Sequence, residues 1–180
     1  MADQIQLEIV TPRGRALAVT VDEVTAPSVN GEFGVLPGHL PLLAALRTGI
    51  VSYRQGSETH RCAVGAGFAE AGPDKVVILT DEYAERAQID PVLVRKDLAE
   101  VQQQLGKFEG VPIVAPDAKG GETQEIEARA QRDVLIAREN WLAAELELYG
   151  DPPAATQRPF EEYGPIAPPP DDEIPNGNSE

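Results

Sequence analysis

The sequence predicts an α+β protein: an N-terminal antiparallel β-sandwich, then a C-terminal α-helical hairpin, then a disordered acidic tail rich in proline. Three observations predict this organisation. Short runs of alternating apolar and polar residues fill residues 1–88, and a period of three and four residues governs residues 89–150. Residues 151–180 contain eight of the 16 prolines, with seven acidic residues and one basic residue, and offer too little apolar surface for a packed core.

The N-terminal segment is expected to form a sandwich because its apolar runs are short and turn signals rich in glycine and proline separate them. Parallel strands joined directly need a long crossover, and no stretch here is long enough for a crossover helix, so the strands are expected to pair antiparallel. The expected strands lie at residues 5–9, 17–21, 50–54, 59–64 and 76–79.

The second segment is expected to form two helices. Asp90 followed by Pro91 is a helix start, because a carboxylate can cap the first turn and proline needs no N–H partner there. Glycines and prolines interrupt the pattern at residues 110–121, and Gly150 followed by proline ends it. One apolar stripe on each helix predicts an antiparallel hairpin. The second stripe comprises Ile126, Ala130, Val134, Ala137, Trp141, Ala144 and Leu148.

Composition excludes several functions. A formal net charge of −15 disfavours binding to nucleic acid and to anionic lipid surfaces, since both need cations. We expect no targeting segment and no membrane span, because no run of apolar residues approaches ~20. The single cysteine, Cys62, allows no intrachain disulfide and is expected to be a buried packing thiol. No Cys/His spacing suits zinc, and neither a metal nor a cofactor is expected.

Two stretches are more specific than composition. Residues 24–27 and 31–43 have the sequences VTAP and GEFGVLPGHLPLL, and residues 64–70 and 84–87 have the sequences VGAGFAE and AERA. In order and spacing, residues 5–90 resemble the epsilon subunits of bacterial-type F-type ATP synthases. The helical hairpin fits that family in kind, whereas the tail and the 109–121 connection look like additions.

The resemblance implies a non-catalytic subunit of the central stalk of a proton-translocating F1Fo ATP synthase. Such a subunit couples rotation of the c-ring to the gamma shaft, and its hairpin can regulate ATP hydrolysis. The implied partners are the gamma subunit, the c-ring and, through the hairpin, the alpha and beta catalytic subunits. The implied location is the cytoplasmic face of the bacterial inner membrane, with membrane association only through the complex.

The resemblance also implies contact residues. It places Glu32, Phe33 and His39 at the contact with the c-ring and rotor. From the residues themselves, Gly31, Gly34 and Gly38 are expected to provide backbone freedom where side chains would clash, so that a stiff loop presents this contact. The alternative interpretation is a rigid connection between two strands.

Regulation is where the sequence departs from the family. Some members bind ATP through Ile/Leu-Asp-x-x-Arg-Ala, but Leu93 and Val94 stand at the last two positions here, so we predict weak or absent ATP binding. In the family, basic residues of the second helix face an acidic loop of the beta subunit, and Arg129, Arg132 and Arg138 are the candidates. Residues 122–149 nevertheless hold seven acidic residues against these three arginines, which favours a weak brake. The alternative is that Arg129 and Arg132, three residues apart on one side of the helix, form a local basic patch that still docks.

Two other functions stay open at this stage. One is a small β-sandwich enzyme that uses an acidic cluster, Asp81, Glu82 and Glu85, together with His39; the lack of a nucleophile–base pair argues against it. The other is a free-standing interaction module with a coiled helical hairpin.

Four further residues receive structural interpretations. Gly65-x-Gly67 predicts a tight strand junction rather than a phosphate loop, because no Lys-Ser/Thr follows. Trp141 is expected to pack on the helix stripe, and Arg86 to balance the acidic cluster.

Overall fold

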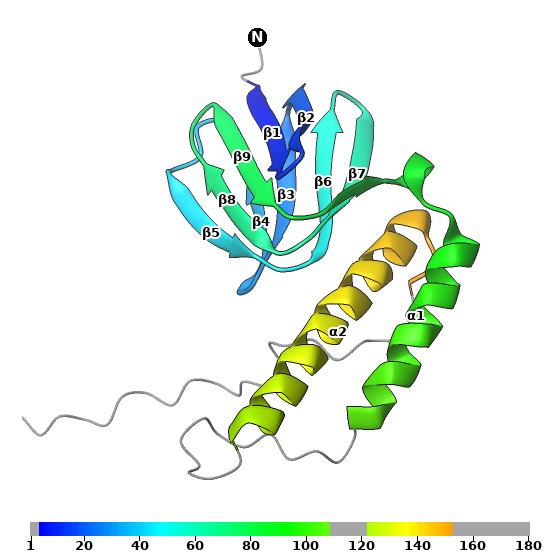
Figure 1. Ribbon diagram of the computed structural model, residues 1–180. Helices are drawn as coiled ribbons and strands as arrows, with labels where there is room; N and C mark the ends of the chain where they lie inside the picture. The colour runs from blue at the N-terminus through cyan, green and yellow to red at the C-terminus, as the bar shows by residue number, and fades with distance from the viewer. Residues whose placement is uncertain (1–3, 109–121, 153–180) are drawn as a thin grey trace, which may run out of the picture.

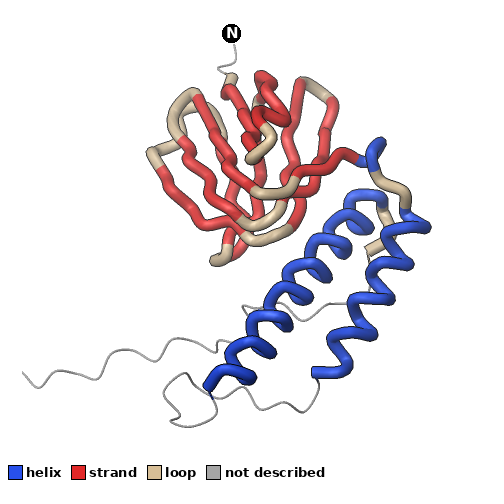
Figure 2. Tube along the Cα trace, viewed as in Figure 1, coloured by secondary structure: helices blue, strands red, loops and turns tan. Residues whose placement is uncertain are grey.

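The computed structural model describes residues 4–108 and 122–152, with the backbone alone for residues 122–126. Strands occupy the first part of the chain and the long helices the second, so the two kinds of structure lie in separate parts of the molecule (Figures 1 and 2). Most of the expected tail and the expected break between the helices lie outside the described residues.

The strands form one continuous sheet in the order β10-β7-β6-β3-β5-β8-β9-β1-β2, with β4 paired to β3. This sheet folds over itself into the predicted sandwich, and the five expected strands correspond to β1, β2, β6, β7 and β9. The strands are β1 (Ile5–Thr11), β2 (Gly14–Val21), β3 (Glu23–Ser28), β4 (Gly31–Val35), β5 (Leu42–Leu46), β6 (Gly49–Gln55), β7 (Glu58–Val64), β8 (Gly67–Ala71), β9 (Lys75–Thr80) and β10 (Tyr83–Glu85).

One strand pair departs from the expected antiparallel arrangement. β1 and β9 run parallel, with Leu7 opposite Val76 and Ile9 opposite Ile78. The expectation assumed that a parallel connection needs a helix. Here the chain returns through the seven intervening strands, which make the crossover themselves.

The sandwich core is aliphatic, as the low aromatic content of 5% requires. Ile5, Leu7 and Ile9 of β1 are completely buried, and Val76 and Ile78 of the parallel partner β9 are buried beside them. Cys62 is buried in the same core, and burial raises the pKa of its thiol to about 12. The thiol therefore stays protonated and unreactive, which agrees with the predicted packing role.

The first long helix, α1 (Pro91–Leu105), begins as predicted. Oδ1 of Asp90 accepts hydrogen bonds from the backbone N–H groups of Val92 at 2.9 Å and Leu93 at 3.4 Å, and Pro91 occupies the first turn. Short 3-10 helices precede and follow α1, namely η1 (Arg86–Gln88) and η2 (Gly106–Phe108). None of the helices in the described parts of the chain is long and apolar enough to cross a membrane.

The second helix, α2 (Glu122–Tyr149), ends at Gly150, as predicted. Gly150 has φ +100° and donates to the carbonyls of Leu146 and Glu147 at 3.1 Å, while Asp151 N–H donates to the Leu146 carbonyl at 2.9 Å. A residue other than glycine would be strained at this φ, which makes Gly150 the stop signal.

The predicted apolar stripe of α2 is only half correct. Trp141, Ala144 and Leu148 are buried, but Val134 is 69% exposed and Ala137 is exposed as well. The predicted stripe fits a helix that packs against a single partner. Instead α2 lies between the sheet and α1 (Figure 1), so its C-terminal half buries additional positions: Ile136, Glu139, Leu142 and Leu146.

Candidate docking surfaces and the sheet–helix interface

The predicted contact residues come from two different parts of the chain. Glu32 and Phe33 belong to strand β4, where Glu32 is exposed and Phe33 packs partly against the sandwich core. His39 lies in the turn between β4 and β5, and its Nδ1 is 2.7 Å from the carbonyl oxygen of Leu40. The sequence predicts a loop over these positions, but the structure forms a strand followed by a turn.

These two parts sit at opposite ends of β5. The β3–β4 turn is hydrogen-bonded to Ala45 near the end of β5, whereas Gly38 N–H donates to the Pro73 carbonyl at 2.7 Å near its start. A five-residue strand spans roughly 13 Å at about 3.3 Å per residue. Glu32 and His39 therefore form two separate points, and the expectation that one loop presents both is wrong.

The three glycines of this region play different parts. Gly31 and Gly38 have φ of +117° and +82°, which side chains rarely adopt. Gly34 has no positive φ, and no heavy atom lies within 4 Å of the position that a Cβ would take. The expected need for glycine is thus met at two positions and is wrong at Gly34.

The strand junction predicted from Gly65-x-Gly67 is confirmed. A Cβ at Gly67 would lie 2.0 Å from the carbonyl oxygen of Leu79, closer than any real contact. Glycine is required here because β8 and β9 approach each other at this point.

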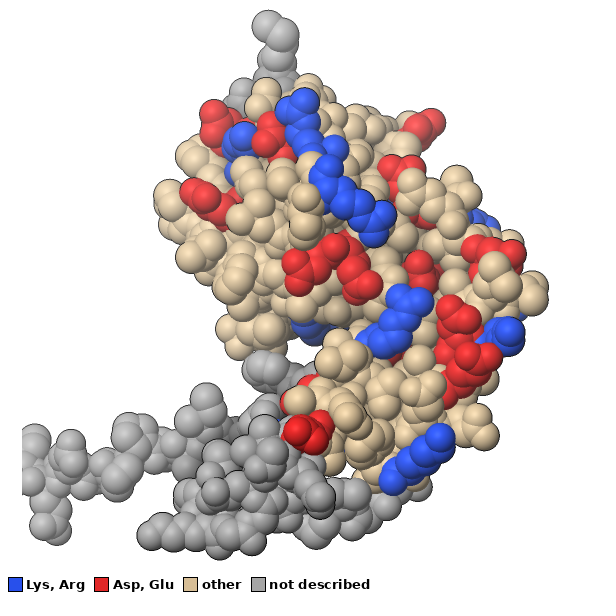
Figure 3. All heavy atoms as spheres, in the orientation of Figure 1, with Lys and Arg blue, Asp and Glu red and all other residues tan. Residues whose placement is uncertain are grey.

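An exposed apolar face lies on the outer side of β5, β8 and β9. Leu43, Phe68 and Leu79 are 73%, 56% and 52% exposed. In Figure 3 uncharged side chains cover the lower part of this side of the sandwich, and charged side chains gather toward its upper end. This face was not predicted from the sequence, although the run at residues 76–79, apolar on both sides of its strand, was the signal that could have indicated it.

The acidic cluster does not meet His39. Gly38, next to His39, bonds to Pro73 just before β9, whereas Asp81 follows the far end of that six-residue strand. Among the described residues, no three His, Cys, Asp or Glu side chains are grouped so that they could hold a metal ion. The acidic cluster and His39 therefore do not form one site.

A second apolar surface of the sheet is covered by the hairpin. Ile50 of β6, Ala63 of β7 and Ala84 of β10 are paired side by side across three strands. Trp141 and Leu142 of α2 are buried in the same cluster. The predicted packing role of Trp141 is confirmed, and α2 packs on the sandwich as well as on α1.

Three arginines from three elements hold the end of α2. Arg61 of β7 lies 3.6 Å from Glu147, the Arg86 guanidinium stacks 5.2 Å from the centre of the Tyr149 ring, and Arg95 of α1 forms a salt bridge with Asp151. We call this set the arginine clasp. Arg86 was expected to balance the acidic cluster, but it contacts the end of α2 instead.

Carboxylates also gather where the sandwich meets the hairpin. Burial raises the pKa of Glu82, which follows β9, and the pKa of Glu145 on α2. The neighbouring Asp81 raises the pKa of Glu82 further, and Glu82 and Asp97 do the same for Glu145. Arg138 opposes both shifts and lies 3.7 Å from Asp97 of α1. One guanidinium thus offsets several acidic groups at this junction.

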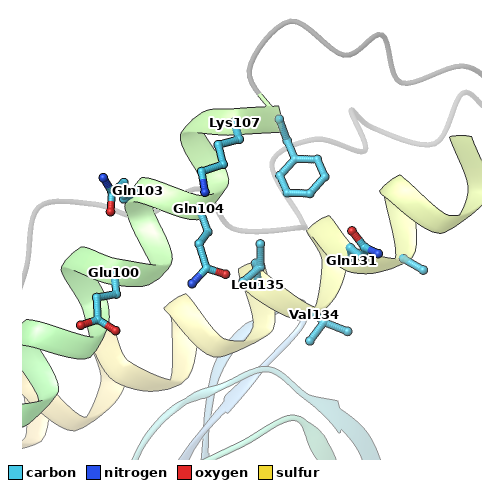
Figure 4. Close-up of a pocket in the computed structure, with 9 residues that line it drawn as sticks. Glu100, Gln103, Gln104, Lys107, Gln131, Val134 and Leu135 are labelled. Carbon is cyan, nitrogen blue, oxygen red and sulfur yellow. The ribbon is translucent and has the colours of Figure 1, made fainter. Parts of the chain in front are cut away.

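An open cleft of about 830 Å³ lies between α1 and α2 toward the far end of the hairpin (Figure 4). Its lining mixes polar side chains such as Gln104 and Lys107 with the apolar Leu135. This cleft was not predicted from the sequence.

Comparison with known proteins decides the family. The family model for the ATP synthase delta/epsilon chain β-sandwich domain matches residues 4–87. ATP synthase epsilon chain 2 of Syntrophotalea carbinolica is 41% identical over 109 residues, which cover 61% of this chain and 74% of that protein. The chain belongs to the ATP synthase epsilon chain family. The family resemblance stated from the sequence is therefore confirmed.

Other relatives extend the similarity beyond the sandwich. The epsilon chain of Geobacter metallireducens is 39% identical over 126 residues, 69% of this chain and 86% of that protein. A chain in the cryo-EM structure of the Euglena gracilis mitochondrial ATP synthase, OSCP/F1/c-ring, has a TM-score of 0.59 at 23% identity and covers 79% of this chain and 81% of that chain. That likeness establishes the shared fold.

The residues tied to regulation in the epsilon family have defined surroundings here. Leu93, which is exposed, and Val94, which is buried, are aliphatic and supply no cation for a phosphate. Arg95 is engaged with Asp151. Of the three predicted docking arginines, Arg138 faces Asp97 of α1. Arg129 and Arg132 lie one turn apart on α2, and both already interact within the chain.

Proposed function

We propose that this chain is a non-catalytic rotor subunit in the central stalk of a proton-translocating F1Fo ATP synthase. In this role residues 1–88 link the c-ring to the gamma subunit, residues 89–150 regulate ATP hydrolysis, and residues 151–180 form an acidic appendage. The subunit would work at the cytoplasmic face of the bacterial inner membrane, held there by its partners. It would need no cofactor of its own.

The observation that supports this role best is the exposed apolar face of β5, β8 and β9. A folded domain that leaves Leu43, Phe68 and Leu79 open to solvent is suited to a partner that buries them. We assign this face to the gamma subunit. The continuous hydrogen-bonded sheet behind it makes the domain stiff, which the transmission of torque requires.

The c-ring contact is assigned to the β3–β4 hairpin and to the β4–β5 turn. Glu32 is exposed on β4, and His39 is held by the turn that Gly38 fixes to Pro73. Because the two points lie at opposite ends of β5, we propose that Glu32 and Phe33 form one rotor contact and His39 a second one.

Regulation is assigned to the hairpin, which would reach the alpha and beta subunits when it leaves the sandwich. In this structure the hairpin packs on the sandwich, and the C-terminal half of α2 is buried against the sheet. Arg138 is paired with Asp97, so this arginine is not presented to another subunit. The excess of acidic residues on α2 opposes insertion beside an acidic loop. We therefore propose a weak brake.

The test is reconstitution of epsilon-depleted ATP synthase with the full chain, with a chain ending at residue 150 and with one ending at residue 88. We expect all three to restore ATP-driven proton pumping. We expect ATP hydrolysis to rise by less than about twofold when residues 89–150 are removed. Loss of pumping with the shortest chain would contradict the division of roles, and a many-fold rise in hydrolysis would contradict the weak brake.

A further inference from the structure

The exposed face of the sandwich is built from two rows of side chains that cross the strands. In the first row Ala45 is paired with Phe68, Phe68 with Leu79, and Leu79 with Val10, so that four strands contribute one apolar residue each. We call this set the apolar row. Phe68 and Leu79, at its centre, are more than half exposed. Such a row is a continuous strip rather than scattered apolar residues.

The opposite layer of the same sheet provides a covered counterpart. There the row Ile50–Ala63–Ala84 is buried beneath α2. At the margin of that row, Arg61 reaches Glu147 of the covering helix at 3.6 Å. Within this chain, an apolar row is therefore matched by an apolar partner and a charge beside it by the opposite charge.

The second row of the exposed face contains such a charge. Its members, paired in order, are Leu43, Glu70, Val77 and Glu8. Glu8 is already neutralised by Lys75 at 3.0 Å and by Arg15 at 4.0 Å. No ion pair joins Glu70 to any residue that the structure describes, and its neighbours across the strands, Leu43 and Val77, are apolar.

The end of the apolar row opens into a depression of about 360 Å³. Val10, Pro12, Phe68 and Leu79 supply apolar walls, and Asp81 lies at the lining as well. Gly67 also lines it, at the point where no side chain fits beside the Leu79 carbonyl. The depression has room for an apolar side chain that projects from a partner.

We propose that the partner surface that covers this face presents a basic side chain to Glu70 and inserts an apolar side chain into the depression beside Phe68 and Leu79. This rests on the proposed function, so the partner is the gamma subunit of the same ATP synthase. A carboxylate covered by an apolar surface without a partner loses its hydration, which makes a cation opposite Glu70 necessary. The apolar row then supplies affinity, and Glu70 fixes the register of the two surfaces.

The test measures binding of the full chain to the gamma subunit of its own ATP synthase, at low and at high ionic strength. The variants are Glu70→Lys, Glu70→Gln and Leu79→Asp. The control is Glu58→Lys, which makes the same charge change at the start of β7, where the Glu58 side chain is 78% exposed. All three positions are exposed in the free chain, and the thermal transition verifies that each variant is folded.

We expect Glu70→Lys to weaken binding by at least about tenfold at low salt, and Glu70→Gln to weaken it less and to flatten the salt dependence. Leu79→Asp should abolish binding, and Glu58→Lys should leave it within about twofold.

Loss of binding with Leu79→Asp but not with Glu70→Lys would overturn this inference and leave the rotor function standing. Full binding by both variants would overturn the inference together with the assignment of this face to gamma. Loss with Glu70→Lys alone would also overturn it, because the apolar row would then lie outside the interface.

Discussion

Gln102 of α1 donates an amide hydrogen bond to the carboxylate of Glu139 on α2, at 3.1 Å between Nε2 and Oε1. Glu139 is only 6% exposed, so this contact satisfies a carboxylate that the two helices have taken out of water. A charged residue at a position that faces another helix restricts which helix register is tolerated.

Gln102→Leu is therefore expected to destabilise the protein by about 1–3 kcal/mol, since it leaves a buried acceptor without its donor. Urea unfolding measures the effect. Gln103→Leu, an exposed neighbour on the same helix, should change little. The double variant Gln102→Leu/Glu139→Leu should recover most of the loss, and a simple sum of the two single effects would show that the pair does not interact.

Gly67→Ala should destabilise the sandwich by about 1–3 kcal/mol, because the added Cβ would lie 2.0 Å from the Leu79 carbonyl oxygen and β8 or β9 would have to move. Gly34→Ala is the matched control. It has no positive φ and an open surrounding, so its effect should stay within about 0.5 kcal/mol. Equal midpoints of thermal unfolding for the two variants would contradict the close approach at Gly67.

The junction between sandwich and hairpin should respond to pH. Burial raises the pKa of Glu145 from 4.5, and the carboxylates of Glu82 and Asp97 raise it further, whereas Arg138 lowers it. The pKa of Glu82 is itself raised by burial and by Asp81. Because the folded-state pKa is the higher one, the protonated form stabilises the fold fully below pH 4.5. That contribution is lost as pH rises through the raised pKa.

Glu145→Gln should consequently match the native chain below pH 4.5 and exceed it in stability at neutral pH. Urea midpoints at several pH values, taken as the difference between variant and native chain, isolate this residue from the other titrating groups. A difference that does not change with pH would contradict the raised pKa.

The arginine clasp should govern how readily the end of α2 separates from the rest of the molecule. Exposed ion pairs contribute only about 0.2–1 kcal/mol each, so the combined variant Arg61→Gln/Arg86→Gln/Arg95→Gln is the informative one. Hydrogen exchange of the last turns of α2 should accelerate several-fold in this variant, and added salt should accelerate it in the native chain. The control is Arg13→Gln in the β1–β2 turn, which should leave the exchange of α2 unchanged.

Local signals in the sequence were sufficient for some features and not for others. The start of α1 at Asp90 and the end of α2 at Gly150 were predictable, because a helix cap and a left-handed stop depend only on neighbouring residues. The buried face of α2 depends on what lies on each side of it. Val134 was therefore placed inside although it is exposed, and Leu142 was overlooked although it is buried.

The candidate surfaces follow the same division. The motif around Glu32 and His39 was recognised, but the separation of these residues results from the pairing of β5 with β8, which no local pattern contains. The apolar row likewise exists only after four strands are aligned. Its member Leu79 belonged to a predicted strand, yet its exposure depends on the absence of a covering element in the described part of the chain.

The parallel pairing of β1 with β9 has a consequence for biosynthesis. β1 begins at Ile5, and β9, its parallel partner, ends at Thr80. Of the sandwich strands β1 leaves the ribosome first, so it must wait for almost the whole sandwich before it can pair with β9. Contacts between such distant segments make folding slow, and they leave nascent apolar strands exposed in the meantime. The hairpin emerges after all of the sandwich strands, onto a sandwich that has just become able to close.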